Sequence, residues 1–223
     1  MDLAIIGAGS VGLTSGVFCM HTKNRVISNI LGACFNFFSF LTPTIRKKYK
    51  NITIKSIENF DKEFDKLWDS VKDEITIGVI RDSKYLNWRY IQKPEIDYTV
   101  FSIYEKNELK GYIVLKIEKK FNLKIGFIID ILTCSSNQLY PQQLITKAVL
   151  FFKDEDVDII SCLMFSQHKY YKALKKKGFI KISKKYFPQG IYFGAKVHSN
   201  LVKKEIVKKK ENWFLTWGDT DVI

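Results

Sequence analysis

The sequence predicts a mixed α/β fold with one central sheet, and three patterns between residues 52 and 197 support this prediction. Residues 52–57 alternate apolar and polar side chains at period two, which is typical of a half-buried strand. Residues 59–74 then repeat apolar side chains every three or four positions, as an amphipathic helix does. Farther along, a helical pattern separates two nearly all-apolar strands, and such a crossover predicts a parallel pair.

The other elements follow from the same two periodicities and from turn residues. A short helix over 83–92 ends at the step from Lys93 to Pro94, because the residue before proline avoids the α region. Strands over 98–104 and 111–118 are joined by a polar loop, which predicts an antiparallel hairpin. The later elements are a buried strand over 124–134, a helix over 142–156, a buried strand over 157–164, a helix over 167–178 closed by Gly178, and strands over 179–183 and 190–197.

The charge balance of the 223-residue chain raises the question of nucleic-acid binding. The net charge is +13, but nearly all of the excess comes from lysine, and arginine occurs only at positions 25, 46, 81 and 89. Base recognition depends strongly on the planar fork of arginine. We therefore expect no specific nucleic-acid partner and interpret the lysine clusters as solvated surfaces. Salt-sensitive attachment to nucleic acid or to an anionic membrane is the alternative.

The cysteines and the apolar segments bear on metal binding and location. The four cysteines are widely spaced with no CxxC pair, so we expect reduced thiols and no metal site. The longest apolar stretch, residues 26–41, is interrupted by polar residues and is shorter than a membrane span. The N-terminal residues lack the features of a secretory signal. We expect a cytoplasmic protein.

The element order, together with the segment YYKALKKKGFIK at 170–181, resembles the GNAT acetyltransferase superfamily. The resemblance covers about two-thirds of the chain and includes the Gly178–Phe179 pair that follows the late helix. A second segment, RDSKYLNWRY at 81–90, is similar to the equivalent helix in GNAT-like proteins of bacterial surface-polysaccharide loci. The resemblance implies a GNAT-like fold over 51–223, with a C-terminal extension, and acetyl-CoA as the cofactor.

In that family the pantetheine arm of acyl-CoA pairs with the main chain at the end of the fourth strand, which corresponds here to Ile131, Leu132 and Thr133. The pyrophosphate binds at the following helix N-terminus in a Q/R-x-x-G-x-G/A loop. Gln138 matches this pattern, but Pro141 and Gln143 replace the two small residues. Ser135, Ser136 and Asn137 are possible substitute donors, although they are also typical of a polar loop and helix cap.

The family resemblance also suggests which residues move protons. Family members often have a tyrosine four residues before the Gly-Phe pair that protonates the departing thiolate, but Leu174 occupies this position. Tyr170, one helical turn earlier, and its neighbour Tyr171 are the candidate replacements, with packing in the core as the alternative. Asp130 is the candidate general base, because a carboxylate on an apolar strand is costly unless it is paired or functional. We expect its side chain on the same face as Ile128 and Leu132, and a structural hydrogen bond is the alternative role.

The first 30 residues carry a different pattern. An apolar strand precedes Gly7-Ala8-Gly9-Ser10-Val11-Gly12, a complete G-x-G-x-x-G, and VGLTSGV then opens a predicted helix. This run resembles the start of nucleotide-sugar dehydrogenases of the UDP-glucose 6-dehydrogenase kind, which bind NAD. Asn29 lies where the ribose-binding acid is expected, and the rest of the Rossmann unit is missing. We therefore interpret residues 1–30 as a truncated Rossmann-like βα segment.

Residues 31–50 read as an apolar helix with a basic end, which connects the two parts. Together with the preceding strand, residues 26–50 are a candidate contact with a membrane surface or a partner domain.

The sequence thus predicts an N-acyltransferase that transfers an acyl group from acyl-CoA to an amine, on a small molecule or on a sugar-nucleotide or surface-polysaccharide precursor. A catalytically silent GNAT-like structural or binding module is the main alternative. An NAD-binding remnant of a nucleotide-sugar dehydrogenase is a further one.

Overall fold

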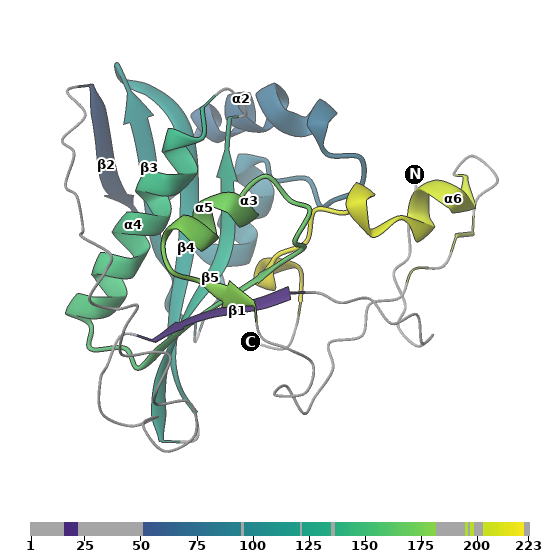
Figure 1. Ribbon diagram of the computed structural model, residues 1–223. Helices are drawn as coiled ribbons and strands as arrows, with labels where there is room; N and C mark the ends of the chain where they lie inside the picture. The colour runs from purple at the N-terminus through teal and green to yellow at the C-terminus, as the bar shows by residue number, and fades with distance from the viewer. Residues whose placement is uncertain are drawn as a thin grey trace.

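Within the part of the chain that the computed structural model describes, seven strands form one mixed sheet in the order β2-β3-β4-β5-β6-β1-β7 (Figure 1). The structure describes residues 16–21, 51–94, 96–120, 122–134, 137–181, 195, 197–198 and 203–220. The strands are β1 (Gly16–His21), β2 (Ile52–Ile57), β3 (Thr99–Glu105), β4 (Glu108–Lys120), β5 (Leu123–Thr133), β6 (Ile159–Met164) and β7 (Ile180–Lys181). The predicted mixed α/β class is confirmed.

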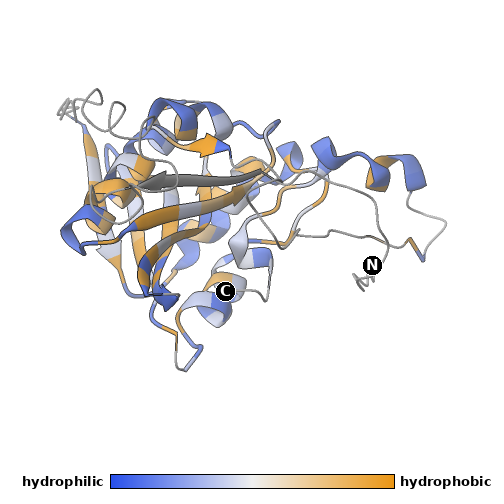
Figure 2. Cartoon of the chain, turned by 60° about the horizontal axis from the view of Figure 1, so that its bottom comes forward, coloured by the Kyte–Doolittle hydropathy of each residue, from blue (hydrophilic) through white to orange (hydrophobic). Residues whose placement is uncertain are grey.

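Helices cover both faces of the sheet, with α4 in front and α2 and α3 behind it in Figure 1. The α-helices are α2 (Lys62–Val71), α3 (Ser83–Tyr90), α4 (Leu139–Asp154), α5 (Tyr171–Lys176) and α6 (Lys204–Lys208). The short 3₁₀ helices in the described ranges are η1 (Lys72–Glu74), η3 (Lys210–Asn212) and η4 (Trp217–Asp219). Apolar residues line the strands and the inner sides of these helices, and polar residues lie outside (Figure 2).

Capping and apolar spacing explain the helices behind the sheet. The carboxylate of Asp61 accepts the Glu63 N–H at 2.8 Å at the start of α2. Asp82 accepts the Tyr85 N–H at 2.7 Å at the start of α3. Such caps satisfy N–H groups that have no partner inside the helix. Phe64, Leu67 and Val71 then form the buried side of α2.

The strand pairing confirms both predicted connections. β3 and β4 are antiparallel neighbours, so the predicted hairpin is present. β5 and β6 are parallel, and α4 crosses between them. Gly126 in β5 lets α4 approach closely, because a Cβ atom there would lie 2.6 Å from the Phe152 ring. α4 is thus fixed against the centre of the sheet.

Of the first 50 residues, the structure describes only 16–21, so it tests only part of the predictions for this region. Residues 16–21 form β1, which pairs antiparallel with β6 and with β7, where the Rossmann-like interpretation expected a helix. That part of the prediction is wrong, because a strand here completes the backbone hydrogen bonds of β6. The glycine motif at 7–12 and the connecting segment at 31–50 lie outside the described residues.

The C-terminal part also differs in detail from the prediction. Of the predicted strand over 179–183, the structure describes β7 (Ile180–Lys181) and leaves 182–183 outside the described residues, as it does most of the predicted strand over 190–197. Residues 213–220, here named the C-terminal strap, return to the sheet, and Phe214 N–H donates to Ile77 C=O at 2.8 Å. None of the helices in the described ranges is long and apolar enough to cross a bilayer. Those ranges also hold no cluster of three or more potential metal ligands.

Candidate functional site

The parallel pairing of β5 with β6 stops well before β5 ends. It runs from Ile125 to Ile128 on β5, opposite Ile159 to Cys162 on β6, whereas β5 continues to Thr133. On its other side β5 stays paired with β4 as far as Thr133. Among the described residues, the last five positions of β5 therefore have a strand partner on one side only.

A β-bulge lies at the point where the two strands part. Leu115 of β4 is opposite Ile128, but the next residue, Val114, is opposite Asp130, so Ile129 is an extra residue in β5. Gly126 faces Phe152 of α4, and regular alternation would place Asp130 on that same face. Asp130 instead contacts Tyr90 of α3 on the opposite face. The prediction that Asp130 shares a face with Ile128 is wrong because the bulge reverses the alternation.

Asp130 is completely buried and its carboxylate is fully engaged within the protein. Its oxygens accept hydrogen bonds from the Arg81 guanidinium, from the hydroxyls of Tyr90, Tyr112 and Thr216, and from the Ile131 N–H, at 3.0–3.2 Å. Burial and the Asp130 charge both raise the pKa of Tyr90 and Tyr112, so both phenols stay protonated as donors. These contacts favour the structural role of Asp130 over the general-base role, which stays a prediction.

Arg81 holds two carboxylates together at the centre of this network. Its Nε lies 3.0 Å from Asp130 Oδ2, and its Nη2 lies 2.7 Å from Asp219 Oδ2. Its Nη1 donates to Val79 C=O at 2.9 Å, and its guanidinium lies 4.4 Å from the centre of the Phe214 ring. The side chain of Arg81 has no solvent exposure. Arg81 therefore joins β5 to the C-terminal strap.

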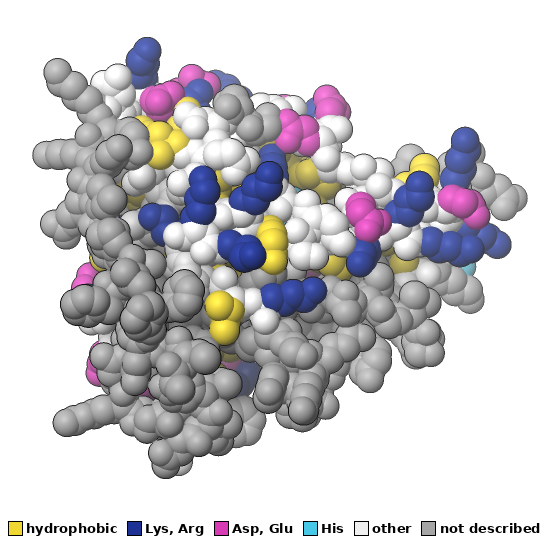
Figure 3. Space-filling view, in the orientation of Figure 1, with side chains coloured by type: hydrophobic (Ala, Val, Ile, Leu, Met, Phe, Trp, Pro, Cys, Tyr) yellow, Lys and Arg dark blue, Asp and Glu magenta, His cyan; other side chains and the backbone are white. Residues whose placement is uncertain are grey.

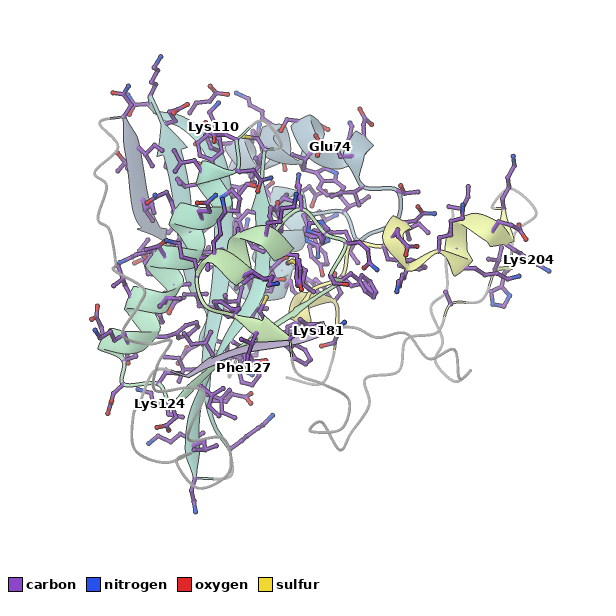
Figure 4. All side chains as sticks on the ribbon, in the orientation of Figure 1. Glu74, Lys110, Lys124, Phe127, Lys181 and Lys204 are labelled. Atoms are coloured by element: carbon purple, nitrogen blue, oxygen red, sulfur yellow. The ribbon has the colours of Figure 1, made fainter. Side chains whose placement is uncertain are left out.

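A second buried arginine, Arg89 of α3, also holds the strap. Arg89 donates to the carbonyl oxygens of Gly218 and Thr220, both at 3.0 Å. The Trp217 ring packs edge-on against Phe127 of β5 (labelled in Figure 4), with the ring centroids 6.2 Å apart. The strap thereby covers the face of β5 that carries Asp130.

The strap contains two buried polar atoms without a hydrogen-bond partner in the described residues, Trp217 Nε1 and Asp219 Oδ1. Burial raises the pKa of Asp219, Arg81 opposes this increase, and the Asp130 charge adds to it. Asp219 therefore holds the strap through Oδ2, which binds Arg81, whereas its Oδ1 is buried without a hydrogen bond in the described residues.

Tyr170 brings a hydroxyl to the open end of β5. This hydroxyl accepts the Thr133 N–H at 2.7 Å and lies 3.3 Å from Thr133 Oγ1. Tyr170 is 1% exposed, and burial raises its pKa, so the phenol is protonated near neutral pH. The structure thus brings two predicted site residues together. Tyr171 is half-buried, and its ring lies below the Lys175 ammonium group.

The main-chain groups at the end of β5 already have partners. The N–H of Ile131 donates to Asp130 Oδ1 at 3.0 Å, and the N–H of Thr133 donates to Tyr170. These are the amides on the side away from β4, because Cys134 N–H donates to Lys110 C=O of β4. Leu132 is buried opposite Tyr112. An extended ligand that paired with this edge of β5 would have to displace Asp130 from the Ile131 N–H and Tyr170 from the Thr133 N–H.

The start of α4 offers few free N–H groups. Leu139 N–H donates to Asn137 Oδ1 at 3.0 Å, Tyr140 N–H donates to Asn137 C=O at 3.3 Å, and Pro141 has no N–H. Gln138 is the N-cap residue and makes no side-chain cap bond. Ser135 and Ser136 lie outside the described residues. Asn137 therefore acts as a helix cap, and few backbone N–H groups at the start of α4 are free to bind a phosphate.

His168 lies between Tyr170 and the C-terminal strap. Its ring stacks on Phe214 with centroids 4.7 Å apart and contacts Tyr170 at the same centroid distance. Burial, together with the charges of Lys169 and Arg81, lowers the pKa of His168 to about 3. The folded protein therefore contains a neutral imidazole at ordinary pH.

This burial predicts a loss of stability in mild acid. The unfolded chain takes up a proton on His168 below about pH 6.5, whereas the folded protein does not do so until about pH 3. The free energy of unfolding should fall by about 2 kcal/mol between pH 7 and pH 5 from this residue. Urea unfolding at pH 7 and pH 5 measures this fall in the free energy of unfolding. His168→Phe, which keeps the ring stacking, should abolish the share of the fall that comes from His168. An equal acid loss in wild type and variant would contradict the prediction.

Sequence reasoning missed the residues that surround Asp130, which are Arg81, Tyr90, Tyr112, Thr216 and Asp219. Among them, Arg81 and Asp219 form an ion pair. They are 138 positions apart, and only the fold brings them together. Arg81 opens the RDSKYLNWRY segment and is one of four arginines in a lysine-rich chain, which was the available signal.

No protein-family model and no curated protein sequence matches this chain. Among solved structures, it is similar to a GCN5-related N-acetyltransferase from Anabaena variabilis, with 13% identity and a TM-score of 0.50 over 76% of this chain and 38% of that one. The chain has the GNAT acetyltransferase fold. A likeness at this identity establishes the fold alone.

Two further structures are similar at lower TM-scores. An aminoglycoside acetyltransferase from an uncultured soil metagenomic sample, solved with trehalose, has 15% identity and a TM-score of 0.44 over 66% of this chain and 96% of that one. The C-terminal domain of a putative lysylphosphatidylglycerol synthetase from Agrobacterium fabrum has 10% identity and a TM-score of 0.42, over 78% of this chain and 52% of that one. No comparison supports the dehydrogenase resemblance of residues 1–30.

Proposed function

We propose that this chain is an N-acyltransferase that binds acetyl-CoA at the open end of β5 and transfers the acetyl group to an amine. The observation that carries the proposal is the Tyr170 hydroxyl, which lies 2.7 Å from the Thr133 nitrogen in a GNAT fold. This is the main-chain position where the family resemblance places the pantetheine arm. A proton donor and the expected cofactor position therefore coincide.

The proposed reaction needs one proton to be delivered and one to be removed. The acceptor nitrogen attacks the thioester carbonyl carbon, a C–N bond forms, and the C–S bond breaks. Tyr170 gives its hydroxyl proton to the departing thiolate, and the proton released by the amine restores the phenol. The raised pKa of Tyr170 keeps this proton in place until the thiolate forms.

Asp130 has a positioning role in this proposal. Its carboxylate binds the Ile131 N–H directly and is itself held by Arg81. The bulge and the following residues of β5 are therefore ordered before any ligand arrives, which lowers the entropy cost of binding, although the Ile131 N–H must leave Asp130 to pair with a ligand. The acceptor class remains the one implied by the sequence resemblance, an amine on a small molecule, a sugar nucleotide or a polysaccharide precursor.

The test is an acyl-transfer assay that detects the free thiol of coenzyme A. We expect thiol release from acetyl-CoA to require both the protein and an amino-sugar acceptor. Acceptor-independent release, or no release from any acceptor in a broad amine panel, would contradict the proposal.

A silent GNAT-like module is the second candidate, and the start of α4 specifically favours it. Two of the first helical N–H groups are occupied there and Pro141 supplies none, so the cofactor pyrophosphate gains little from the helix N-terminus.

This feature predicts the effect of restoring the family residue. Pro141→Gly adds an N–H donor and removes bulk, so we expect the affinity for coenzyme A to rise about tenfold, from one added bond to a charged group. Calorimetric titration measures this change. Gln142→Gly, at the neighbouring position, is the matched control for the general effect of glycine on α4. An equal change in both variants would show that the missing Pro141 donor is irrelevant.

A further inference from the structure

A basic face lies on α5 and β7, outside the candidate site. It consists of the exposed side chains Lys172, Lys175, Lys176, Ile180 and Lys181, here named the α5–β7 face. Figure 3 shows Lys and Arg side chains in the middle of this view, with the acidic side chains displaced toward its edges. Lys181, at the end of β7, is labelled in Figure 4.

The packing of α5 determines which side chains point outward. Ala173, Leu174 and Phe179 are each 1% exposed and anchor the helix to the core. The three α5 lysines are spaced i, i+3 and i+4, which places them on one side of the helix. Gly178, with φ of 86°, ends the helix by donating its N–H to Lys175 C=O at 3.0 Å. The lysines are therefore held outward by the fold.

The lysines of this face have no ion-pair partner among the residues that the structure describes. The sequence contains no aspartate or glutamate between Asp158 and Glu205. None of the four exposed lysines forms an ion pair with any residue in the described ranges, whereas Lys169 pairs with Glu74 at 3.0 Å. Unpaired charges of one sign on a small surface sum to a positive potential, which attracts anionic partners.

Ile180 distinguishes one kind of anionic partner from another. It is 47% exposed and sits beside Lys181 at the end of the sheet. Recognition of nucleic acid favours arginine and exposed stacking aromatics. This face offers lysines and an aliphatic side chain, while the Tyr171 ring is half-buried below Lys175. Lysines together with an exposed aliphatic side chain on the edge strand of the sheet fit a surface with negative headgroups above an apolar layer.

We propose that the α5–β7 face binds the surface of a bilayer that contains anionic phospholipid. The lysines contact the headgroups, and Ile180 reaches the boundary between headgroups and acyl chains. The inference is independent of acyl transfer, because it uses no residue of the candidate site.

The test is co-sedimentation of the full chain with vesicles, without any form of coenzyme A. Vesicles of phosphatidylcholine mixed equally with phosphatidylglycerol should bind the protein, and binding should fall steeply with salt. Pure phosphatidylcholine vesicles should not bind it. Absence of binding to the mixed vesicles at low salt would overturn the proposal.

The triple variant Lys172→Gln, Lys175→Gln and Lys176→Gln tests the location of the surface. Each lysine near an anionic membrane contributes a factor of about five, so binding should fall about 100-fold. The matched control is Lys62→Gln, Lys66→Gln and Lys84→Gln, which makes the same charge change at exposed positions of α2 and α3. Equal losses in the two triple variants would overturn the assignment to the α5–β7 face.

Ile180→Ser tests the lipid itself. It should weaken binding to mixed vesicles about fivefold, because the variant has no apolar side chain to transfer from water into the membrane. Binding to a DNA duplex should be unchanged. Vesicle binding unaffected by this variant, with tighter binding to the duplex than to vesicles, would overturn the membrane proposal in favour of a nucleic-acid surface.

Discussion

Arg81→Met is expected to lower the free energy of unfolding by about 3–5 kcal/mol, because it leaves two buried carboxylates without their cation. The carboxylates of Asp130 and Asp219 lie 3.0 Å and 2.7 Å from the guanidinium. Neither can reach water without moving the C-terminal strap, since their side chains are at most 3% exposed. Urea unfolding monitored by tryptophan fluorescence measures the loss and also reports on Trp213 and Trp217 of the strap.

The control is a double-mutant cycle with Asp130→Asn. If the pair interacts as the structure shows, the double variant should be less destabilised than the sum of the two single variants by at least about 1 kcal/mol. A loss below about 1 kcal/mol for Arg81→Met, or strict additivity, would contradict the central role given to this arginine.

Tyr170→Phe is expected to reduce kcat for acyl transfer about 100-fold or more, with little change in KM for acetyl-CoA, because it removes the proton donor to the thiolate. The ring of Tyr170 keeps its packing in the variant. The Thr133 N–H loses its acceptor, which costs about 1–3 kcal/mol of stability in the free protein.

Tyr171→Phe is the matched control, since it removes a phenol from the neighbouring position. It should leave kcat unchanged. A series of acetyl thioesters with different leaving thiols separates catalysis from structure. The small thiol release that remains in Tyr170→Phe should depend more strongly on the pKa of the leaving thiol, because no proton donor assists its departure. Equal loss of kcat in both variants would indicate that these tyrosines support packing and not proton transfer.

The sequence predicted the sheet well because its periodicities are local. The hairpin of β3 and β4, the parallel crossover through α4 and the C′ role of Gly178 all follow from residues close in the chain. The departure from the family's phosphate-binding loop was also visible locally, at Pro141 and Gln143.

The site was harder to predict because its contacts are long-range. Asp130 stood out as a carboxylate on an apolar strand, but its orientation depends on a bulge that no residue type reveals. Its partners Arg81 and Thr216 lie 49 and 86 positions away. β1 is part of the sheet because its backbone pairs with β6, and the glycine motif that precedes β1 in the sequence does not predict this pairing.

Calorimetric titration with acetyl-CoA tests the central claim most directly, that the open end of β5 is a cofactor site. We predict binding of acetyl-CoA and of coenzyme A with one site per chain, and no binding of NAD. No heat from either form of coenzyme A, in protein shown to be folded in the same sample, would contradict the acyltransferase and leave a silent module.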